Sequence, residues 1–260
     1  MATGKVLVRQ SGGSLILTHS GNGNAKLQLG PTDIQAEERE EAELGLGAPA
    51  APGHKGWYSR GYLPHFDAEK ALQFVTFRLA DALPQEKLRQ LEQEIAHVPA
   101  ASRDRKRRQR IEQWLDAGMG CCALRHPRMA EVMQQTLQKF DGERYRLIAW
   151  CIMPNHVHVL IETLAPLARI VQSWKSFSGR WALSHNAELG LGVPGREFWM
   201  REYWDRYIRD EAHFHSVENY IHNNPAKAGL CCEAWEWPWS SAHAAQPFGH
   251  GSPDGQGGGQ

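Results

Sequence analysis

Two short apolar segments separated by only three residues constrain the fold of this chain more than any other feature. Residues 145–152 (YRLIAWCI) and 156–162 (HVHVLIE) have the length and composition of strands, and Met153, Pro154 and Asn155 lie between them. A connection this short joins neighbouring antiparallel strands. The sequence therefore predicts a β-hairpin at this position.

Two further strands and several helices are expected around this hairpin. Alternating apolar residues predict a strand over 73–79, with Val75, Phe77 and Leu79 on one face, and another strand over 198–204. Apolar stripes at helical spacing predict the helices. The expected helices cover residues 84–95, 102–116, 127–140, 167–181 and 210–224.

Without the additional helices, the order of elements is strand, helix, strand, strand, helix, strand. This is the order of the ferredoxin-like βαββαβ fold, an α+β fold with one antiparallel sheet. We therefore expect such a sheet with extra helices and one helix appended at its C-terminal side. The fold carries many activities, so it does not by itself indicate a function.

The two ends of the chain differ in composition from the middle. Residues 1–56 contain Gly-Gly and Gly-Asn repeats and five glutamates within residues 37–43, and residues 246–260 are rich in glycine. Such segments bury too little apolar surface to pack, which predicts a flexible low-complexity extension and a disordered tail. VLVR and SLILTH within the extension could form short strands. One folded domain is expected over residues 57–245.

Charge and composition exclude some classes of function. Lysine plus arginine and aspartate plus glutamate both number 29, so the chain lacks the charge excess of an indiscriminate polybasic DNA binder. Residues 101–150 nevertheless carry 11 basic and 6 acidic side chains, which predicts a local basic face. No apolar run approaches the ~18–20 residues of a membrane span, and no signal peptide is expected. Five cysteines without a disulfide or CxxC pattern favour a reducing cytoplasm.

One strand of the hairpin carries two histidines suited to metal binding. Side chains at i and i+2 of a strand share a face, so His156 and His158 should be neighbours. The residues expected to face the core instead are Val157, Val159 and Ile161. Two imidazoles so placed bind one divalent metal when a third ligand approaches. Spacing alone leaves open a second interpretation, a pair of hydrogen-bonded histidines on a half-exposed strand.

The last helix contains a tyrosine and an asparagine at a spacing of four. Asp210 is expected to cap this helix and Pro225 to stop it. Tyr220 and Asn224 then face the same way, at the border of a buried stripe that comprises Phe214, Val217 and Ile221. A phenol beside an amide oxygen near the histidine strand would place a nucleophile next to a metal. In the alternative interpretation, Tyr220 is only a border residue and Asn224 only a helix cap.

Together these stretches resemble a known family, the REP-associated tyrosine transposases, in the single-tyrosine branch of the HUH endonucleases, where U denotes a hydrophobic residue. The similarity covers most of residues 57–245 in one order. Its motifs are WYSRGYLPHF with VTFRLAD, FDGERYRLIAWCIMPNHVHVLIE, SWKSFSGRW, FWMREYWDRYIRDEAHF, ENYIHNNPAKAGL and WPWSS. The extension over residues 1–56 does not match that family.

The resemblance implies both a site and a reaction. His156 and His158 match the two HUH ligands of a Mg²⁺ or Mn²⁺ ion, and Asn224 matches the residue that completes the protein ligands. Tyr220 matches the nucleophile, which cleaves single-stranded DNA at hairpin-forming palindromic repeats and forms a 5′-phosphotyrosine. The resemblance favours a monomer, and no small-molecule cofactor is expected because the sequence has no Walker-type glycine loop. Tyr207 is the other tyrosine considered as nucleophile, but it lacks an amide four residues later.

Contacts to DNA phosphates are expected from basic side chains on two helices. The first set forms a dense run on the helix over 102–116, for which a merely solvated helix face is the alternative. The residues of both sets are Arg103, Arg105, Lys106, Arg107, Arg108, Arg110, Lys175 and Arg180. Trp174 and Phe177 lie on an apolar stripe and are expected in the core.

Two functions of other classes fit the same residues. One is a hairpin-DNA or RNA-binding regulator that keeps the fold without using its chemistry. The other is a metal hydrolase that uses His156 and His158 with water as the nucleophile, although the sequence lacks the added carboxylate ligands of a two-metal site. A covalent tyrosyl–DNA adduct would distinguish strand transfer from both.

Overall fold

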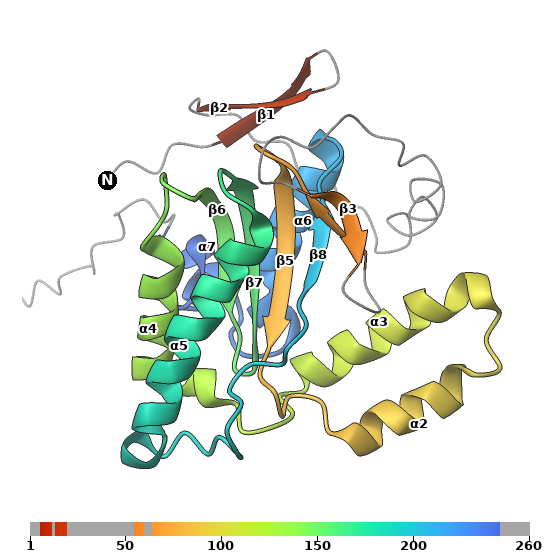
Figure 1. Ribbon diagram of the computed structural model, residues 1–260, viewed down its shortest axis with the longest axis vertical. Helices are drawn as coiled ribbons and strands as arrows, with labels where there is room; N and C mark the ends of the chain where they lie inside the picture. Colours follow the sequence, from red (N-terminus) through yellow and green to blue (C-terminus); the bar gives the residue numbers. More distant parts are fainter. Residues whose placement is uncertain (1–5, 12–13, 20–54, 60–63, 245–260) are drawn as a thin grey trace, which may run out of the picture.

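A four-stranded antiparallel sheet forms the centre of the protein (Figure 1). The computed structural model describes residues 6–11, 14–19, 55–59 and 64–244. In sheet order the strands are β6 (Tyr145–Ile152), β7 (His156–Thr163), β5 (Leu72–Arg78) and β8 (Trp204–Tyr207). The second, third, first and fourth strands of the chain thus lie side by side, and every pairing is antiparallel. This arrangement confirms the ferredoxin-like βαββαβ fold.

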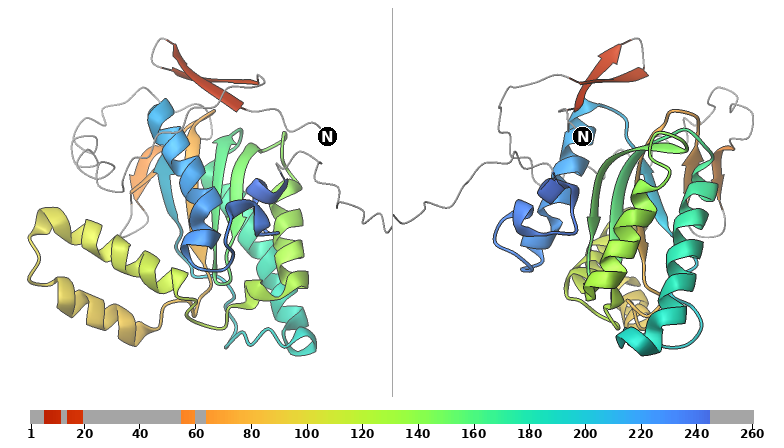
Figure 2. Two further views of the ribbon diagram at one scale, coloured as in Figure 1. Left: turned by 180° about the vertical axis from the view of Figure 1, so that it is seen from behind. Right: turned by 90° about the vertical axis from the view of Figure 1, so that its left-hand side faces the viewer.

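Helices cover both faces of this sheet. α4 (Pro127–Gln138) and α5 (Leu167–Leu189) lie on one face, and α6 (Glu211–Lys227) lies on the other (Figure 2). The core beneath α4 and α5 includes Val75, Phe77, Val157, Val159 and Ile161. The core beneath α6 includes Leu72, Phe74, Leu160, Phe214, Val217 and Ile221. The central strands β5 and β7 are therefore buried on both faces, and their alternation decides which core each side chain enters.

α2 (Gln85–Ile95) and α3 (Ala100–Asp116) form a two-helix arm that projects from one end of the sheet (Figure 1). The loop that follows the arm is fixed to the sheet by Asp81, whose carboxylate accepts a hydrogen bond from the Cys121 N–H at 2.6 Å. Gly120 has φ +83°, and a Cβ there would lie 2.7 Å from the Asp81 carbonyl oxygen. Only glycine permits this close approach, so the root of the arm has a defined position.

The position of the fourth strand differs from the sequence prediction. The regular strand covers Trp204–Tyr207 and overlaps the predicted range 198–204 only at Trp204, while Trp199 forms an isolated antiparallel bridge to Leu79 just after β5. Phe198 and Trp199 are buried, but they pack against α5 from an extended loop. A Cβ on Gly179 of α5 would lie 3.3 Å from the Trp199 ring, so this glycine allows the loop to approach the helix closely. Apolar residues in this segment therefore mark a packed loop that continues the pairing with the end of β5 only through the bridge at Trp199.

The end of α6 also differs from the sequence prediction. Asp210 caps the helix as expected, because its carboxylate accepts a hydrogen bond from the His213 N–H at 2.7 Å. Pro225, however, lies inside the helix, which continues to Lys227. Proline removes one backbone donor, and the helix still closes its last turn with a bond from Ala228 N–H to Asn224 O.

Shorter elements flank the central sheet. VLVR and SLILTH do form strands, which pair as a hairpin, and a second hairpin precedes the sheet. These strands are β1 (Val6–Ser11), β2 (Ser14–His19), β3 (Gly56–Ser59) and β4 (Pro64–Asp67). The rest of the predicted extension, and the predicted tail over 246–260, lie outside the described residues. The domain boundaries therefore stay predictions.

The segment after α6 closes against strand β6. Ile152 N–H donates to the Trp239 carbonyl at 2.8 Å, and the Trp237 indole N–H donates to the Ile152 carbonyl at 3.0 Å. Short helices η2 (Ala234–Glu236) and α7 (Ser241–Ala244) belong to this segment, and η1 (Ala123–Arg125) precedes α4.

None of the helices in the described part of the chain combines the length and apolar character that a membrane span needs.

Candidate metal and nucleophile site

His156 and His158 lie side by side on the α6 face of β7. Their Nε2 atoms are 3.0 Å apart, and the side chains are only 1% and 3% exposed. The same-face prediction is confirmed, whereas the interpretation of a half-exposed strand is wrong. Two ring nitrogens that converge on one point in a buried place are the arrangement in which imidazoles share a cation.

Hydrogen bonds at the far side of each ring set its orientation. The Asn155 Nδ2 donates to the Met119 carbonyl at 2.9 Å, which turns its Oδ1 toward the His156 Nδ1 at 2.7 Å. An amide oxygen only accepts, so His156 Nδ1 must carry the proton and its Nε2 keeps a free lone pair. The Thr76 hydroxyl forms a hydrogen bond of 2.8 Å with His158 Nδ1, and a hydroxyl is able to accept the proton of that nitrogen. Such outer contacts orient metal-ligating histidines.

Burial keeps both histidines neutral at ordinary pH. Desolvation, assisted by the charge of Arg78, lowers the pKa of His156 to about 3. Desolvation also lowers the pKa of His158 well below its usual value, with contributions from His156 and Lys227. A neutral imidazole is the form that binds a metal, so the pair is ready to act as ligands at pH 7.

Tyr220 of α6 packs against this pair, and Asn224 follows it one helical turn later. The Tyr220 ring centroid lies 5.3 Å from that of His158. Asn224 is 1% exposed, and among the residues that the structure describes neither its Oδ1 nor its Nδ2 has a hydrogen-bond partner. A buried amide without partners is costly, and α6 continues beyond it, so the helix-cap interpretation fails. The predicted stripe of Phe214, Val217 and Ile221 is buried as expected.

The donor set fits a divalent cation. Two neutral imidazole nitrogens and one unpaired amide oxygen lie on facing elements, and these are ligands that Mn²⁺ accepts. Within the described residues, no group of three or more His, Cys, Asp or Glu side chains is placed to hold a metal. An amide such as that of Asn224 is therefore the third protein ligand that this site offers.

Charged residues of α3 and α6 surround the phenol. Lys227 Nζ lies 5.6 Å from the Tyr220 ring centroid and 3.5 Å from the Asp116 carboxylate. The pKa of Tyr220 is raised well above its usual value, mainly by burial and then by the charges of Glu112 and Asp116. The end of α3 is thus joined to α6 beside Tyr220 by the ion pair of Asp116 and Lys227, which the sequence did not reveal.

Half of the predicted phosphate-binding run on α3 takes part in contacts within the arm. Arg107 and Arg110 form ion pairs with glutamates of α2 at 2.6 and 3.6 Å, and Arg103 donates to two backbone carbonyls before α3. Arg105 and Lys106 are exposed. Arg108 is partly buried, and its charge acts on Glu112. The run therefore serves partly to hold the arm together, and its exposed members are the best placed for DNA.

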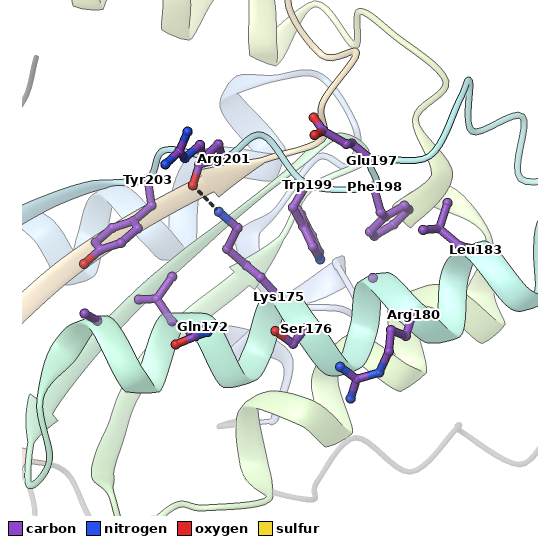
Figure 3. A pocket seen from close by; sticks show the side chains of 13 residues that line it. Gln172, Lys175, Ser176, Arg180, Leu183, Glu197, Phe198, Trp199, Arg201 and Tyr203 are labelled. Carbon is purple, nitrogen blue, oxygen red and sulfur yellow. Dashed lines mark hydrogen bonds between the residues drawn. The ribbon is translucent and has the colours of Figure 1, made fainter. Parts of the chain in front are cut away.

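A cleft of about 580 Å³ lies between α5 and residues 197–203, on the sheet face opposite the histidines (Figure 3). Lys175 and Arg180, both predicted DNA contacts, line it together with Arg201. The Lys175 ammonium donates to the carbonyls of Met200 and Arg201 at 2.6 and 2.7 Å, so it also fixes the loop. Figure 3 shows the Arg180 side chain extending from α5 away from that contact.

The two aromatic residues expected in the core, Trp174 and Phe177, differ in how far they are buried. Trp174 is fully buried beneath α5 and donates its indole N–H to the Tyr145 hydroxyl at 2.9 Å. Phe177 is 46% exposed, so the core prediction is wrong for it. It lies at the edge of the apolar stripe, where the Lys139 ammonium approaches its ring to 5.8 Å.

The fold and the site define an α+β protein in which a histidine pair on a central strand faces a tyrosine and an amide of a helix. Residues 123–224, which contain His156, His158, Tyr220 and Asn224, match the protein family described as "Transposase IS200 like". The resemblance to tyrosine transposases that the motifs indicate is thereby confirmed.

Two relatives found by sequence agree with this result. The REP-associated tyrosine transposase of Escherichia coli K12 is 25% identical over 115 residues, which are 44% of this chain. A putative REP-associated tyrosine transposase of Haemophilus influenzae is 27% identical over 123 residues, 42% of this chain. The matches span 64% of the length of each relative. A solved REP-associated tyrosine transposase bound to a REP hairpin is 17% identical, with a TM-score of 0.42 over 72% of this chain and 84% of that one.

Proposed function

We propose that this protein is a metal-dependent single-strand DNA endonuclease and strand transferase that works through a 5′-phosphotyrosine. The observation that supports this most directly is the position of Tyr220 beside the neutral, convergent histidine pair. The centroids of the Tyr220 and His158 rings are 5.3 Å apart. A nucleophile beside a site for a hard cation suits phosphodiester chemistry. The similarity to REP-associated tyrosine transposases favours hairpin-forming palindromic repeats as the substrate.

The reaction is a transesterification. The Tyr220 oxygen forms a bond to phosphorus, and the bond from phosphorus to O3′ breaks. The electron pair leaves with O3′, which gains a proton, while the phenol loses one. The number of phosphodiester bonds is unchanged, so a second hydroxyl can reverse the step and join strands without ATP.

His156, His158 and Asn224 would hold the divalent ion, Mg²⁺ or Mn²⁺. When bound, such an ion withdraws negative charge from phosphate oxygens. The chain itself orients the ligands: Asn155 and Thr76 fix the two rings, and the second core beneath α6 holds the helix that carries Tyr220.

DNA outside the site would contact two basic surfaces. One is the exposed side of the arm, with Arg105 and Lys106, and the other is the cleft beside α5, with Arg180 and Arg201. Such contacts position a nucleic acid without reading its sequence.

A test of this function compares two tyrosine variants. Wild-type protein and Tyr207→Phe, incubated with Mn²⁺ and labelled single-stranded hairpin DNA, should form a covalent adduct that survives denaturing electrophoresis. Tyr220→Phe should form none and should bind the same DNA equally well. Cleavage with release of both products and no adduct would instead indicate a hydrolase, and binding that chelators do not alter, without cleavage, would indicate a regulator.

A further inference from the structure

Arg78 occupies the histidine face of the sheet, at the end of β5. It lies directly opposite His156 in the antiparallel register of β5 and β7. Thr76, two residues earlier on the same strand, points to His158, with which it forms a hydrogen bond. Side chains at i and i+2 share a face, so Arg78 points to the same side as the histidine pair.

Within the described part of the chain, the guanidinium of Arg78 has no anionic partner. Among the residues that the structure describes, its side chain takes part in no hydrogen bond or ion pair, although it is partly buried. Partial burial lowers the pKa of Arg78, and its charge lowers the pKa of His156. Arginines in such places are usually paired with carboxylates or phosphates.

The backbone at this position is fixed. The Arg78 carbonyl accepts a hydrogen bond from Met200 N–H at 2.9 Å, and the next residue, Leu79, donates to the Asn155 carbonyl at 2.9 Å. The base of the side chain is therefore anchored between the loop over 197–203 and the residue that orients His156. A cation on a rigid support needs little reorganisation when an anion arrives.

From this geometry we propose that Arg78 is a catalytic residue that binds the non-bridging oxygens of the phosphate attacked by Tyr220. The inference rests on the proposed function and adds a group to it. As the Tyr220 oxygen adds to phosphorus, before the bond to O3′ breaks, negative charge accumulates on those oxygens. A planar guanidinium can bind two of them at once and offset that charge. Lys227, the other cation near the phenol, is already paired with Asp116.

The test measures single-turnover adduct formation with saturating hairpin DNA and Mn²⁺. Arg78→Gln should lower the rate constant by about 100- to 1,000-fold, and Arg78→Lys should recover part of the loss. Mn²⁺ affinity, measured by calorimetry, should not fall in Arg78→Gln, because the positive charge of Arg78 in the wild-type protein repels the metal ion. Arg146→Gln removes a strand arginine that is paired with Glu162 away from the site, and it should leave the rate unchanged.

A second substrate separates a phosphate contact from a structural role. DNA with a methylphosphonate at the cleaved position lacks the charge that Arg78 would bind. On that DNA, wild type and Arg78→Gln should differ by less than about tenfold. Equal rates of wild type and Arg78→Gln on normal DNA, or the same large difference on both substrates, would overturn the assignment of Arg78 alone. Absence of any adduct with wild-type protein would overturn the proposed function as well.

Discussion

The Asn155 amide joins the root of the α2–α3 arm to His156, because its Nδ2 donates to the Met119 carbonyl and its Oδ1 accepts from the His156 Nδ1. The Met119 carbonyl fixes which end of the amide faces the ring. The position of the loop after α3 therefore decides how His156 presents its Nε2 lone pair.

Asn155→Ala should weaken Mn²⁺ binding about 10- to 100-fold, the usual cost of losing a group that orients a metal ligand. Asn155→Asp keeps an acceptor for His156 but loses the donor to Met119, so its affinity should lie between those of wild type and Asn155→Ala. Calorimetric titration of Mn²⁺ into the DNA-free protein measures this. An affinity of Asn155→Ala within twofold of wild type would contradict the orienting role.

Asn224→Leu should make the metal-free protein more stable and unable to bind Mn²⁺ tightly. The buried amide has no hydrogen-bond partner among the described residues, so replacing it with an apolar side chain of similar size should raise the free energy of unfolding by about 1–3 kcal/mol. Urea denaturation and metal titration measure the two effects. Asn223→Leu, at an exposed neighbouring position, is the control and should change neither quantity appreciably. A loss of stability in Asn224→Leu would argue against the ligand role.

Acid should destabilise the metal-free fold through the histidine pair. Unfolded histidine takes up a proton below its usual pKa of about 6.5, whereas folded His156 stays neutral to about pH 3. Its contribution to stability is complete above pH ~6.5 and decreases as the pH falls, by about 2 kcal/mol at pH 5. Urea denaturation between pH 7.5 and pH 5 measures this. The slope should flatten in a His156→Gln, His158→Gln double variant and persist in His215→Gln, which removes an exposed histidine of α6.

Glu112→Gln should shift the pH dependence of adduct formation to lower pH. Among nearby charges, that of Glu112 contributes most to raising the pKa of Tyr220. Removing it lowers that pKa, so at a given pH below it the rate should rise, roughly twofold to tenfold, with the fraction of phenolate. Low ionic strength is needed because Glu112 is exposed and salt screens its charge. Glu131→Gln, on α4, should leave the profile in place, and an unshifted profile in Glu112→Gln would refute the electrostatic argument.

Local periodicity was sufficient to predict the core of the site. Alternation along one strand placed His156 and His158 on one face, and a spacing of four on one helix placed Tyr220 beside Asn224. Both patterns depend only on the geometry of a single element. The order of elements likewise predicted the sheet. The three-residue connection over 153–155 left few alternatives to a hairpin of neighbouring antiparallel strands.

Contacts between segments distant in the sequence could not be predicted from such patterns. Arg78 lies on the histidine face, but its position opposite His156 depends on the register between β5 and β7. Asp116 and Lys227 meet only because the arm folds back to α6. The position of β8 was missed for a related reason: Phe198 and Trp199 have the apolar character of a strand, yet they pack against α5.

The closing segment of the described chain has a consequence for self-association. β6 is an edge strand of the sheet, and an edge with free N–H and C=O groups can pair with a strand of another molecule. At Ile152 these groups are already bonded, to the Trp239 carbonyl and the Trp237 indole. A second copy could extend the sheet at this point only after displacing the segment that contains Trp237 and Trp239. These two residues therefore block strand pairing between molecules at this part of the edge.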